Sequence, residues 1–328
     1  MVESDYQMII QDRVYGEINI TNKLIIDLIN SSPMQRLKKI KQGGPTTLIE
    51  PQRNQTRFEH SIGVWYLLHK FGASLEEQVA GLLHDTPHTA FSHVADVVFP
   101  NVSHSFHEKF EEKIILASDV PSILTKHKMK IEEIFNKSNF HLLEVDLPDL
   151  SADRIDYFLR DTRIDPIFPS TLIDLFLKDL FVVNSKFCFK TKSTAVLYTI
   201  LFMDSGKLLW LDANSHGAHG LLGEALKRAL KIKLIIMDDL FKTDDDVLII
   251  LQKSKDKLIK SLLKELSPKK RFIYTPKEES RFWGPNKVRF VDPYVKVGRK
   301  ILRVTELYPE FIKIFSDFKN AYQFIGVK

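Results

Sequence analysis

A ten-residue stretch, HDTPHTAFSH at residues 84–93, constrains this chain more than any other segment. It holds three histidines and one aspartate and directly follows the apolar run VAGLL. Taken singly, each histidine is most simply a surface residue or a hydrogen-bonded core residue, but packing does not explain so dense a cluster. The adjacent His84 and Asp85 offer an imidazole nitrogen and a carboxylate oxygen, which can bind one divalent ion together. An ion held in this way can activate a water molecule.

Two helices are predicted to lead into this stretch. Residues 57–72 repeat apolar side chains at helical spacing, and His60 lies near the start of that helix, at the edge of its apolar face. Residues 74–85 open with Ser74, followed three residues later by Glu77, which is the pattern of a capping box. The pair His84-Asp85 therefore falls at the C-terminal end of the second helix.

Two further helices are expected beyond Pro87, which breaks the second one. Residues 90–99 are predicted to be helical, and His93 and Asp96 then share one face and can form a hydrogen bond. Residues 147–162 form a strongly amphipathic pattern with a polar stripe at positions i, i+4 and i+8: Asp153, Tyr157 and Asp161. A solvated surface is the ordinary explanation for such a stripe, and the wall of a polar pocket is the alternative.

Four candidate metal ligands stand at predicted helix ends or on polar helix faces: His60, His84, Asp85 and Asp153. Two imidazoles and two carboxylates suit one divalent transition metal ion, namely Mn, Fe, Co, Ni or Zn, whereas Mg is possible but less natural beside imidazoles. Such a set leaves coordination positions for water and for a substrate oxygen. The sequence therefore predicts a metal site of the catalytic type rather than a closed structural one.

Composition limits the class of protein. The only cysteine, Cys188, cannot form an intrachain disulfide, which fits a reducing, cytoplasmic setting. The net charge of +5 is a mild excess that is compatible with anionic small molecules or nucleic acid and diagnostic of neither. No apolar run reaches the roughly 18 residues of a membrane span. The N-terminal residues also lack the apolar core of a secretory signal, so we expect a cytoplasmic protein with no membrane partner.

The rest of the chain is predicted to be mainly helical with small β elements. Residues 5–20 could hold a short strand or hairpin, and residues 179–192 alternate around Asn184-Ser185 as a hairpin does. Helical patterns fill residues 193–267.

The composition changes after residue 267. Residues 268–304 are basic and interrupted by prolines, and the pieces RFIY and KVRFV within them are predicted strands, followed by a final helix. We therefore expect a main domain over residues 1–240 and an accessory helical and β region over residues 241–328, packed on the main domain.

The motifs RFEHSIGV, GLLHDTPHTAFSH, HEKFE and SADRIDYFLRD, in this order, resemble those of HD-domain phosphohydrolases. They are similar in particular to the deoxynucleoside triphosphate triphosphohydrolase branch, which includes the SAM-and-HD-domain protein. The stretch RLKKIKQGG and the hairpin near residues 180–192 also match that branch. The resemblance covers roughly residues 30–230, and no SAM domain is expected before it. It implies a mainly α fold: an HD-domain helical bundle with a small β-hairpin and a small α+β C-terminal accessory region.

The resemblance also implies a role for each site residue. Four side chains would ligate the metal ion: His60, His84, Asp85 and Asp153. A second group would act on the phosphate and the leaving oxygen, with Asp96 orienting His93: His88, His93, Asp96, His107 and Glu108. A third group would support the site and bind the nucleotide: Arg57, Arg154, Tyr157, Asp161 and Lys207.

The chain departs from that branch after the predicted hairpin. There the branch supplies an arginine and a tyrosine to the nucleotide site, whereas this chain has Lys207, His216 and His219. Lys207 is expected to replace the arginine as a point charge for phosphate, without its bidentate geometry. The chain is also short beside the tetrameric, nucleotide-activated members, so their nucleotide activation is not carried over to it. We expect a homo-oligomer, a dimer.

Three classes of function are compatible with these features. The first is a nucleotide phosphohydrolase using a metal-activated water, with (deoxy)nucleoside triphosphates ahead of nucleoside monophosphates. The second is a phosphodiesterase or nuclease of the same fold, which is favoured if residues 268–304 bind nucleic acid. The third is a non-catalytic sensor of metal or nucleotide. The complete ligand set, with His93 and Asp96 behind an open metal site, argues against the third, and we expect the first.

Overall fold

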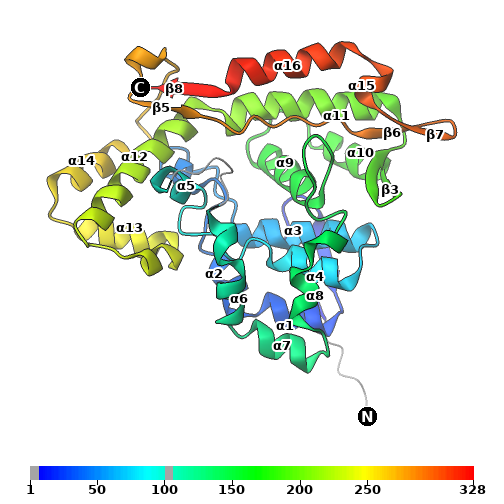
Figure 1. Ribbon diagram of the computed structural model, residues 1–328, viewed down its shortest axis with the longest axis horizontal. Coiled ribbons are helices and arrows are strands. Elements are labelled where there is room, and N and C mark those ends of the chain that lie inside the picture. Colours follow the sequence, from blue (N-terminus) through cyan, green and yellow to red (C-terminus); the bar gives the residue numbers. More distant parts are fainter. Residues whose placement is uncertain (1–6, 100–105) are drawn as a thin grey trace.

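The structure is a computed structural model that describes residues 7–99 and 106–328 (Figure 1). Helices dominate this part of the chain and three small sheets accompany them, which confirms the mainly α prediction. The N-terminal hairpin is also confirmed, with β1 (Met8–Asp12) paired antiparallel to β2 (Gly16–Ile20).

A bundle centred on α3 carries the motifs singled out in the sequence. Its predicted apolar stripe is buried, because Ile62, Trp65 and Leu68 are at most 2% exposed. Burial of side chains of this size contributes roughly 2 kcal/mol each before the loss of conformational entropy. The helices in direct contact with α3 (Arg57–Lys70) are α2 (Ser32–Leu37), α4 (Leu75–Leu83) and α9 (Ala152–Ile164). The remaining short helices of the bundle are α1 (Lys23–Ile29), α5 (Val94–Val98), α6 (Glu111–Leu116), α7 (Val120–Lys126) and α8 (Ile131–Phe135).

The start of α4 is capped as predicted, although the full capping box does not form. Ser74 Oγ accepts a hydrogen bond from the N–H of Glu77 at 3.1 Å. The buried Glu77 carboxylate instead accepts from the N–H groups of Leu142 and Leu143, at 2.6 and 2.8 Å. Glu77 thus ties the loop before α9 to the start of α4, a contact that no local motif reveals.

The helix predicted over residues 90–99 is shorter in the structure, where α5 covers only Val94–Val98. Phe91 and Ser92 have φ angles of 59° and 53°, in the left-handed region that ends regular helix. The N–H of Phe91 donates to Asp244 Oδ1 at 2.6 Å, so a contact with a distant part of the chain overrides the local helical pattern.

A second layer of helices covers α9 (Figure 1). Aromatic side chains fill the interface; the ring of Phe158 on α9 lies 4.8 Å from that of Tyr198 and 5.3 Å from that of Phe202. The long α12 follows α11 after a bend of 43°, where a π-helical turn occurs. These elements are α10 (Thr171–Asp179), α11 (Lys192–Ser205), the π-helical turn Gly206–Trp210 and α12 (Ala213–Lys231).

A four-stranded sheet connects the middle of the chain to its C-terminal region. The predicted hairpin is present, with Asn184 and Ser185 in the left-handed conformation that a two-residue turn requires. The second strand of this hairpin pairs in parallel with a strand from the C-terminal region, Cys188 opposite Tyr294. Residues on both sides of the predicted boundary at residue 240 therefore share one sheet. Its strands, in spatial order, are β3 (Leu180–Val183), β4 (Lys186–Phe189), β6 (Tyr294–Val297) and β7 (Lys300–Arg303).

The C-terminal region contains the expected β elements at other positions. RFIY contributes only an isolated bridge from Tyr274 to Val327, and KVRFV (residues 287–291) is not part of a strand. Both strand predictions are wrong, because β pairing depends on which backbone the fold brings alongside. The elements here are α13 (Asp244–Lys253), α14 (Lys257–Glu265), β5 (Phe282–Pro285), α15 (Val304–Leu307), α16 (Glu310–Tyr322) and β8 (Phe324–Val327), with β5 antiparallel to β8.

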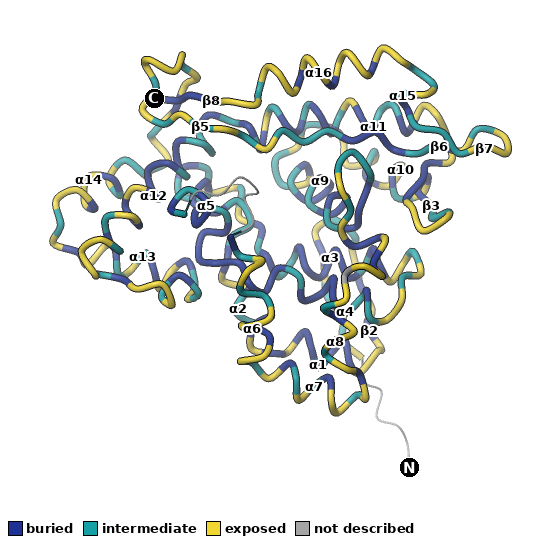
Figure 2. Tube along the Cα trace, viewed as in Figure 1, coloured by how far each residue is buried: buried dark blue, intermediate teal, exposed yellow. Residues whose placement is uncertain are grey.

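Buried residues concentrate along α3, α11 and α12, whereas α13, α14 and α16 expose one side (Figure 2). Within residues 7–99 and 106–328, no helix by itself has the length and apolar character needed to cross a membrane. Only the bent pair Lys192–Trp210 and Ala213–Lys231, taken together, reaches that length and composition.

Candidate active site

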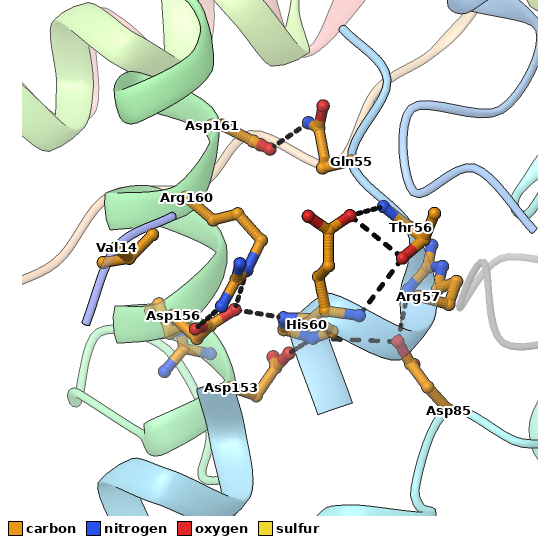
Figure 3. Close-up of polar contacts among 12 residues, drawn as sticks. Val14, Gln55, Thr56, Arg57, His60, Asp85, Asp153, Asp156, Arg160 and Asp161 are labelled. Carbon is orange, nitrogen blue, oxygen red and sulfur yellow. Dashed lines mark hydrogen bonds and ion pairs between the residues drawn. The ribbon is translucent and has the colours of Figure 1, made fainter. Parts of the chain in front are cut away.

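Helix α3 begins at a capping box that fixes its first turn. Thr56 Oγ1 accepts from the N–H of Glu59 at 3.2 Å, and the Glu59 carboxylate accepts from the N–H of Thr56 at 2.8 Å. This start places Arg57 and His60 on adjacent turns of one face (Figure 3). The buried guanidinium of Arg57 donates to Asp85 Oδ2 at 2.9 Å, which joins α3 to the segment that follows α4.

Helices α3 and α9 cross closely at Gly63. A Cβ atom at this position would lie 1.8 Å from Asp156 Oδ1 and 2.4 Å from Arg160 Nη2, so only glycine fits. The crossing brings His60 between two carboxylates of α9. His60 Nε2 lies 3.0 Å from Asp153 Oδ1, and His60 Nδ1 lies 2.7 Å from Asp156 Oδ2 (Figure 3).

Helix α4 delivers His84 and Asp85 to the same place. His84 Nδ1 donates to the carbonyl of Gly81 at 2.7 Å, so in the neutral form of the ring the lone pair is on Nε2. That atom lies 3.5 Å from Asp85 Oδ1 and 3.8 Å from Asp153 Oδ1. Asp85 Oδ2 is 3.7 Å from His60 Nε2. The four predicted ligand residues thus meet, although they come from three separate segments.

The donor set fits a divalent metal ion. The Nε2 atom of His84 is buried and has no hydrogen-bond partner, although an unmatched buried lone pair is costly. One ligand atom from each of His60, His84 and Asp85 lies within 4.8 Å of the others. Imidazole nitrogen together with carboxylate oxygen is the chemistry that divalent transition metals prefer.

The charges at this place also favour a cation. Burial by itself would lower the pKa of His60, but hydrogen bonds with Asp153 and Asp156 raise it to about 10. Burial opposes the ionisation of Asp153 too, yet its contacts with His60 and His84 lower its pKa. Burial would raise the pKa of Asp85, but the charges of Arg57, His84 and His88 together lower it well below its usual range. A proton on His60 and a metal ion are alternative positive charges among the same carboxylates.

Three more histidines gather beside Asp85. One ring nitrogen from each of His88, His93 and His107 lies within 4.8 Å of the others, and the rings of His88 and His107 stack with centroids 3.7 Å apart. His88 Nε2 is 3.2 Å from Asp85 Oδ1. His93 Nδ1 is 3.0 Å from Asp96 Oδ2, as the spacing of three residues predicts.

Burial keeps these three imidazoles neutral near pH 7. Burial and then the charge of Arg57 hold the pKa of His88 well below its usual range. Burial, followed by the charge of His93, lowers the pKa of His107 to about 3. Burial also lowers the pKa of His93, even though Asp96 accepts its hydrogen bond. The group therefore offers lone pairs and uncharged N–H groups to whatever binds beside it.

A cavity of about 670 Å³ opens over both histidine groups, a size typical of small-molecule sites. The polar stripe of α9 faces this cavity, so it forms a pocket wall rather than a solvated surface. Asp161 of that stripe already accepts from Gln55 Nε2 at 2.5 Å and from Trp210 Nε1 at 2.7 Å. The predicted site residues that line the cavity are Arg57, His60, His84, Asp85, His88, His93, Asp96, His107, Glu108, Asp153, Arg154, Tyr157 and Asp161.

The structure does not bring Lys207 to this cavity. It lies in the π-helical turn, where its ammonium group pairs with Asp204 at 3.3 Å and lies over the ring of Phe318 of α16. In this position Lys207 cannot contact a phosphate bound in the cavity, contrary to the prediction from the sequence. The turn and the packing of α16 direct the side chain away, which helical spacing in the sequence cannot show.

Among the residues at or behind the cavity that the sequence did not single out are Asp156, Lys287 and Arg289. Asp156 stands three residues after Asp153 and four before Arg160, and this spacing was the available signal. Lys287 and Arg289 line the cavity from the C-terminal region. Their sequence distance from the other site residues leaves no local signal.

The fold and the site together define a class, a helical protein with an imidazole–carboxylate cation site on the floor of a cavity. A sequence model of the HD domain matches residues 57–161. The uncharacterized protein YdhJ of Bacillus subtilis is 38% identical over 297 residues, which cover 90% of this chain and 91% of that protein. The chain belongs to the HD-domain family.

Other similar proteins include some with named activities. The metal-dependent phosphohydrolase cns2 of Cordyceps militaris is 38% identical over 48% of this chain and 46% of its own length. The deoxynucleoside triphosphate triphosphohydrolase SAMHD1 of Danio rerio is 29% identical over 40% of this chain and 25% of its own length. A crystal structure of a hypothetical protein from Aquifex aeolicus matches 93% of each chain with a TM-score of 0.68 and 23% identity, which shows the same fold.

Proposed function

We propose that this protein is a metal-dependent phosphohydrolase that acts on nucleotides, with (deoxy)nucleoside triphosphates as its substrate class. One observation carries the proposal: four metal-type ligands from three segments converge under a cavity, and His84 Nε2 among them is buried without a partner. The names of cns2 and of the zebrafish protein support phosphohydrolase chemistry and a nucleotide substrate.

His60, His84, Asp85 and Asp153 would hold one divalent ion, for which Mn, Fe, Co, Ni and Zn suit the ligands better than Mg. Such an ion would polarise a phosphoryl oxygen and lower the pKa of a water molecule, so that the nucleophilic hydroxide forms near neutral pH. Asp156 keeps the ring of His60 oriented, because it accepts from His60 Nδ1 at 2.7 Å and leaves His60 Nε2 directed at the other ligands.

His93 and Asp96 form the proton-transfer pair of the mechanism. Because Asp96 accepts from His93 Nδ1, the free Nε2 atom is the one that exchanges a proton with the reactants. The imidazolium of His93, protonated from solvent and stabilised by the Asp96 carboxylate, would donate its Nε2 proton to the leaving oxygen as the phosphorus–oxygen bond breaks. The proton that the attacking water loses passes to solvent.

The remaining lining residues bind the phosphate and the nucleotide. His88 and His107 provide uncharged nitrogen atoms beside Asp85, and Arg57 provides a fixed positive charge near the reacting phosphate. Glu108 lies exposed in the cavity wall close to this group. Arg154, Tyr157 and Asp161 line the α9 side of the cavity, where they would contact the nucleotide.

The test is a screen of nucleoside mono-, di- and triphosphates with added Mn²⁺, in which phosphate, pyrophosphate and triphosphate are resolved as products. We expect turnover that is lost in the variant His84→Ala, Asp85→Ala. Unchanged turnover in that variant would refute the assignment of the site. Exclusive cleavage of monophosphates or of phosphodiesters would replace the proposed substrate class by one of its alternatives, and full metal binding without any turnover would favour a sensor.

A further inference from the structure

A segment of the C-terminal region that is neither helix nor strand, residues 286–290, contributes Asn286, Lys287 and Arg289 to the lining of the cavity. Val288 and Phe290 pack against the hydrophobic core, and Phe290 stacks on Phe315 of α16 with ring centroids 4.6 Å apart. Lys287 and Arg289, by contrast, both line the cavity.

Backbone contacts hold both ends of this segment. The N–H of Asn286 donates to the carbonyl of Gln323 at 2.8 Å, where β5 ends beside β8. The N–H of Asp292 donates to the carbonyl of Pro148 at 2.9 Å, in the loop that leads into α9. The positions of Lys287 and Arg289 are therefore set relative to the helix that carries the predicted ligand Asp153.

Arg154 of α9 adds a third positive charge to this wall. Its guanidinium is buried and donates to the carbonyls of Asp149 and Val145, while its Nε atom is buried without a partner. Within the described part of the chain, neither Arg154 nor Lys287 nor Arg289 has a carboxylate within ion-pair distance. Such a group of cations at a cavity wall is complementary to an anion.

The charges of these residues act on one another and on the site. Burial lowers the pKa of Lys287, and the positive charges of Arg289 and Arg154 lower it further, against the opposing effect of Glu144 and Asp153. The charge of Arg289 also acts on His93 and on Tyr157, so Arg289 faces the space between the histidine group and α9. An anion bound there would relieve the repulsion among the three cations.

We propose that Lys287, Arg289 and Arg154 form an anion site for the substrate phosphates that lie farthest from the four metal-ligand residues. This inference rests on the proposed function and deepens it, because such a site favours nucleoside di- and triphosphates over monophosphates. It also supplies the phosphate-binding charge that Lys207 does not bring to the cavity. Arginine and lysine are the side chains that bind phosphate most strongly, through charge-assisted hydrogen bonds.

The experiment measures binding of inorganic tripolyphosphate and of orthophosphate by titration calorimetry, on the wild-type protein and on Lys287→Met and Arg289→Gln. We expect each substitution to weaken tripolyphosphate binding at least about tenfold, the loss of one charge-assisted hydrogen bond, and to change orthophosphate binding less than about threefold. The matched controls are Lys296→Met and Arg299→Gln, which remove exposed charges of the same region that do not line the cavity. They are expected to bind both anions as the wild type does.

Unchanged tripolyphosphate binding in both cavity variants would overturn the inference. An equal loss of binding in the control variants would overturn it too, because binding would then depend only on the net charge of the protein. The nucleotide screen is then run on the same proteins. Selective loss of tripolyphosphate binding in a protein that hydrolyses no nucleotide would support the anion site while refuting the proposed reaction. Nucleotide hydrolysis with unaltered tripolyphosphate binding in the variants would leave the reaction standing and refute the anion site.

Discussion

His60 Nδ1 lies 2.7 Å from Asp156 Oδ2, and both side chains are at most 1% exposed. Asp156 also accepts from Tyr15 Oη at 2.8 Å and from two nitrogens of Arg160 at 2.9 Å each. Burial would raise the pKa of Asp156, but the charge of Arg160 and the hydrogen bond with His60 lower it, so the carboxylate is ionised. When a metal ion replaces the second proton of His60, the remaining proton therefore stays on Nδ1, and Nε2, which faces Asp153 at 3.0 Å, binds the ion.

The first prediction concerns Asp156→Asn. Because the amide accepts a weaker hydrogen bond, His60 loses its fixed orientation, and we expect metal affinity to fall about 10- to 100-fold. Among the described residues, the buried Arg160 then keeps Asp12 as its one ion-pair partner, at 3.0 Å, so stability should fall by about 3 kcal/mol as well. Chelator competition measures the affinity, and urea unfolding measures the stability.

Tyr15→Phe is the matched control for that variant. It removes one hydrogen bond to Asp156 but keeps the carboxylate and its charge. A loss of about 1 kcal/mol in stability with metal affinity nearly unchanged is expected. Equal loss of metal affinity in both variants would contradict the orienting role of the Asp156 carboxylate.

The second prediction concerns metal binding and stability. A ligand that binds only the folded protein raises its free energy of unfolding by about 3 kcal/mol when present at 100 times its dissociation constant. We expect Mn²⁺ to give this increase in the wild type and little of it in His84→Ala, since His84 Nε2 is available in the structure. For each protein, the free energy of unfolding is measured with and without Mn²⁺. The difference between the two values does not include the destabilisation that the substitution itself causes. The exposed His69→Ala should respond as the wild type does.

The third prediction concerns the helix crossing. Gly63→Ala would place a Cβ atom 1.8 Å from Asp156 Oδ1, so α3 and α9 must separate. Overpacking of this kind costs about 3 kcal/mol, and the separation should also weaken metal binding because His60 moves from Asp153. The control is Gly284→Ala, where no atom lies within 4 Å of an added Cβ. If Gly63→Ala unfolds at the same urea concentration as the control, the close crossing is not present in solution.

The fourth prediction concerns the dependence of stability on pH. Burial, aided by the nearby charges of His93 and His216, lowers the pKa of His219 to about 4. The unfolded chain takes up a proton at this histidine below about pH 6.5, whereas the folded protein resists it down to about pH 4. The free energy of unfolding is therefore highest above pH 6.5, and it decreases as the pH falls from about 6.5 to about 4.

His219→Asn tests this effect, because the amide can still donate to the carbonyl of Ser215, which His219 Nδ1 contacts at 2.8 Å. Between pH 7.5 and pH 5.0 the variant should lose about 2 kcal/mol less stability than the wild type. Urea unfolding at both pH values gives the comparison. An identical loss in the two proteins would show that His219 is not protected from protonation in the fold.

Local patterns in the sequence predicted most helices and both hairpins, and they singled out the four candidate ligand residues. They failed where contacts with distant parts of the chain determine the secondary structure. Residues 90–93 are not helical because Asp244 binds the N–H of Phe91, and KVRFV is not a strand because no strand of the described sheets pairs with it. The sequence identified Lys207 as a positively charged residue. The direction of its side chain, however, depends on a π-helical turn that residue spacing does not reveal.

By itself, the sequence determined which chemistry is available: imidazoles and carboxylates at helix ends, spaced so that each helix presents them on one face. Residue type and helical period suffice for that, since both are properties of a short segment. Only the tertiary structure decided which of these groups meet. The crossing at Gly63 sets His60 against Asp153 and Asp156, and the C-terminal segment brings Lys287 and Arg289 to the same cavity. Contacts between residues so far apart depend on packing of the whole chain, which no local pattern encodes.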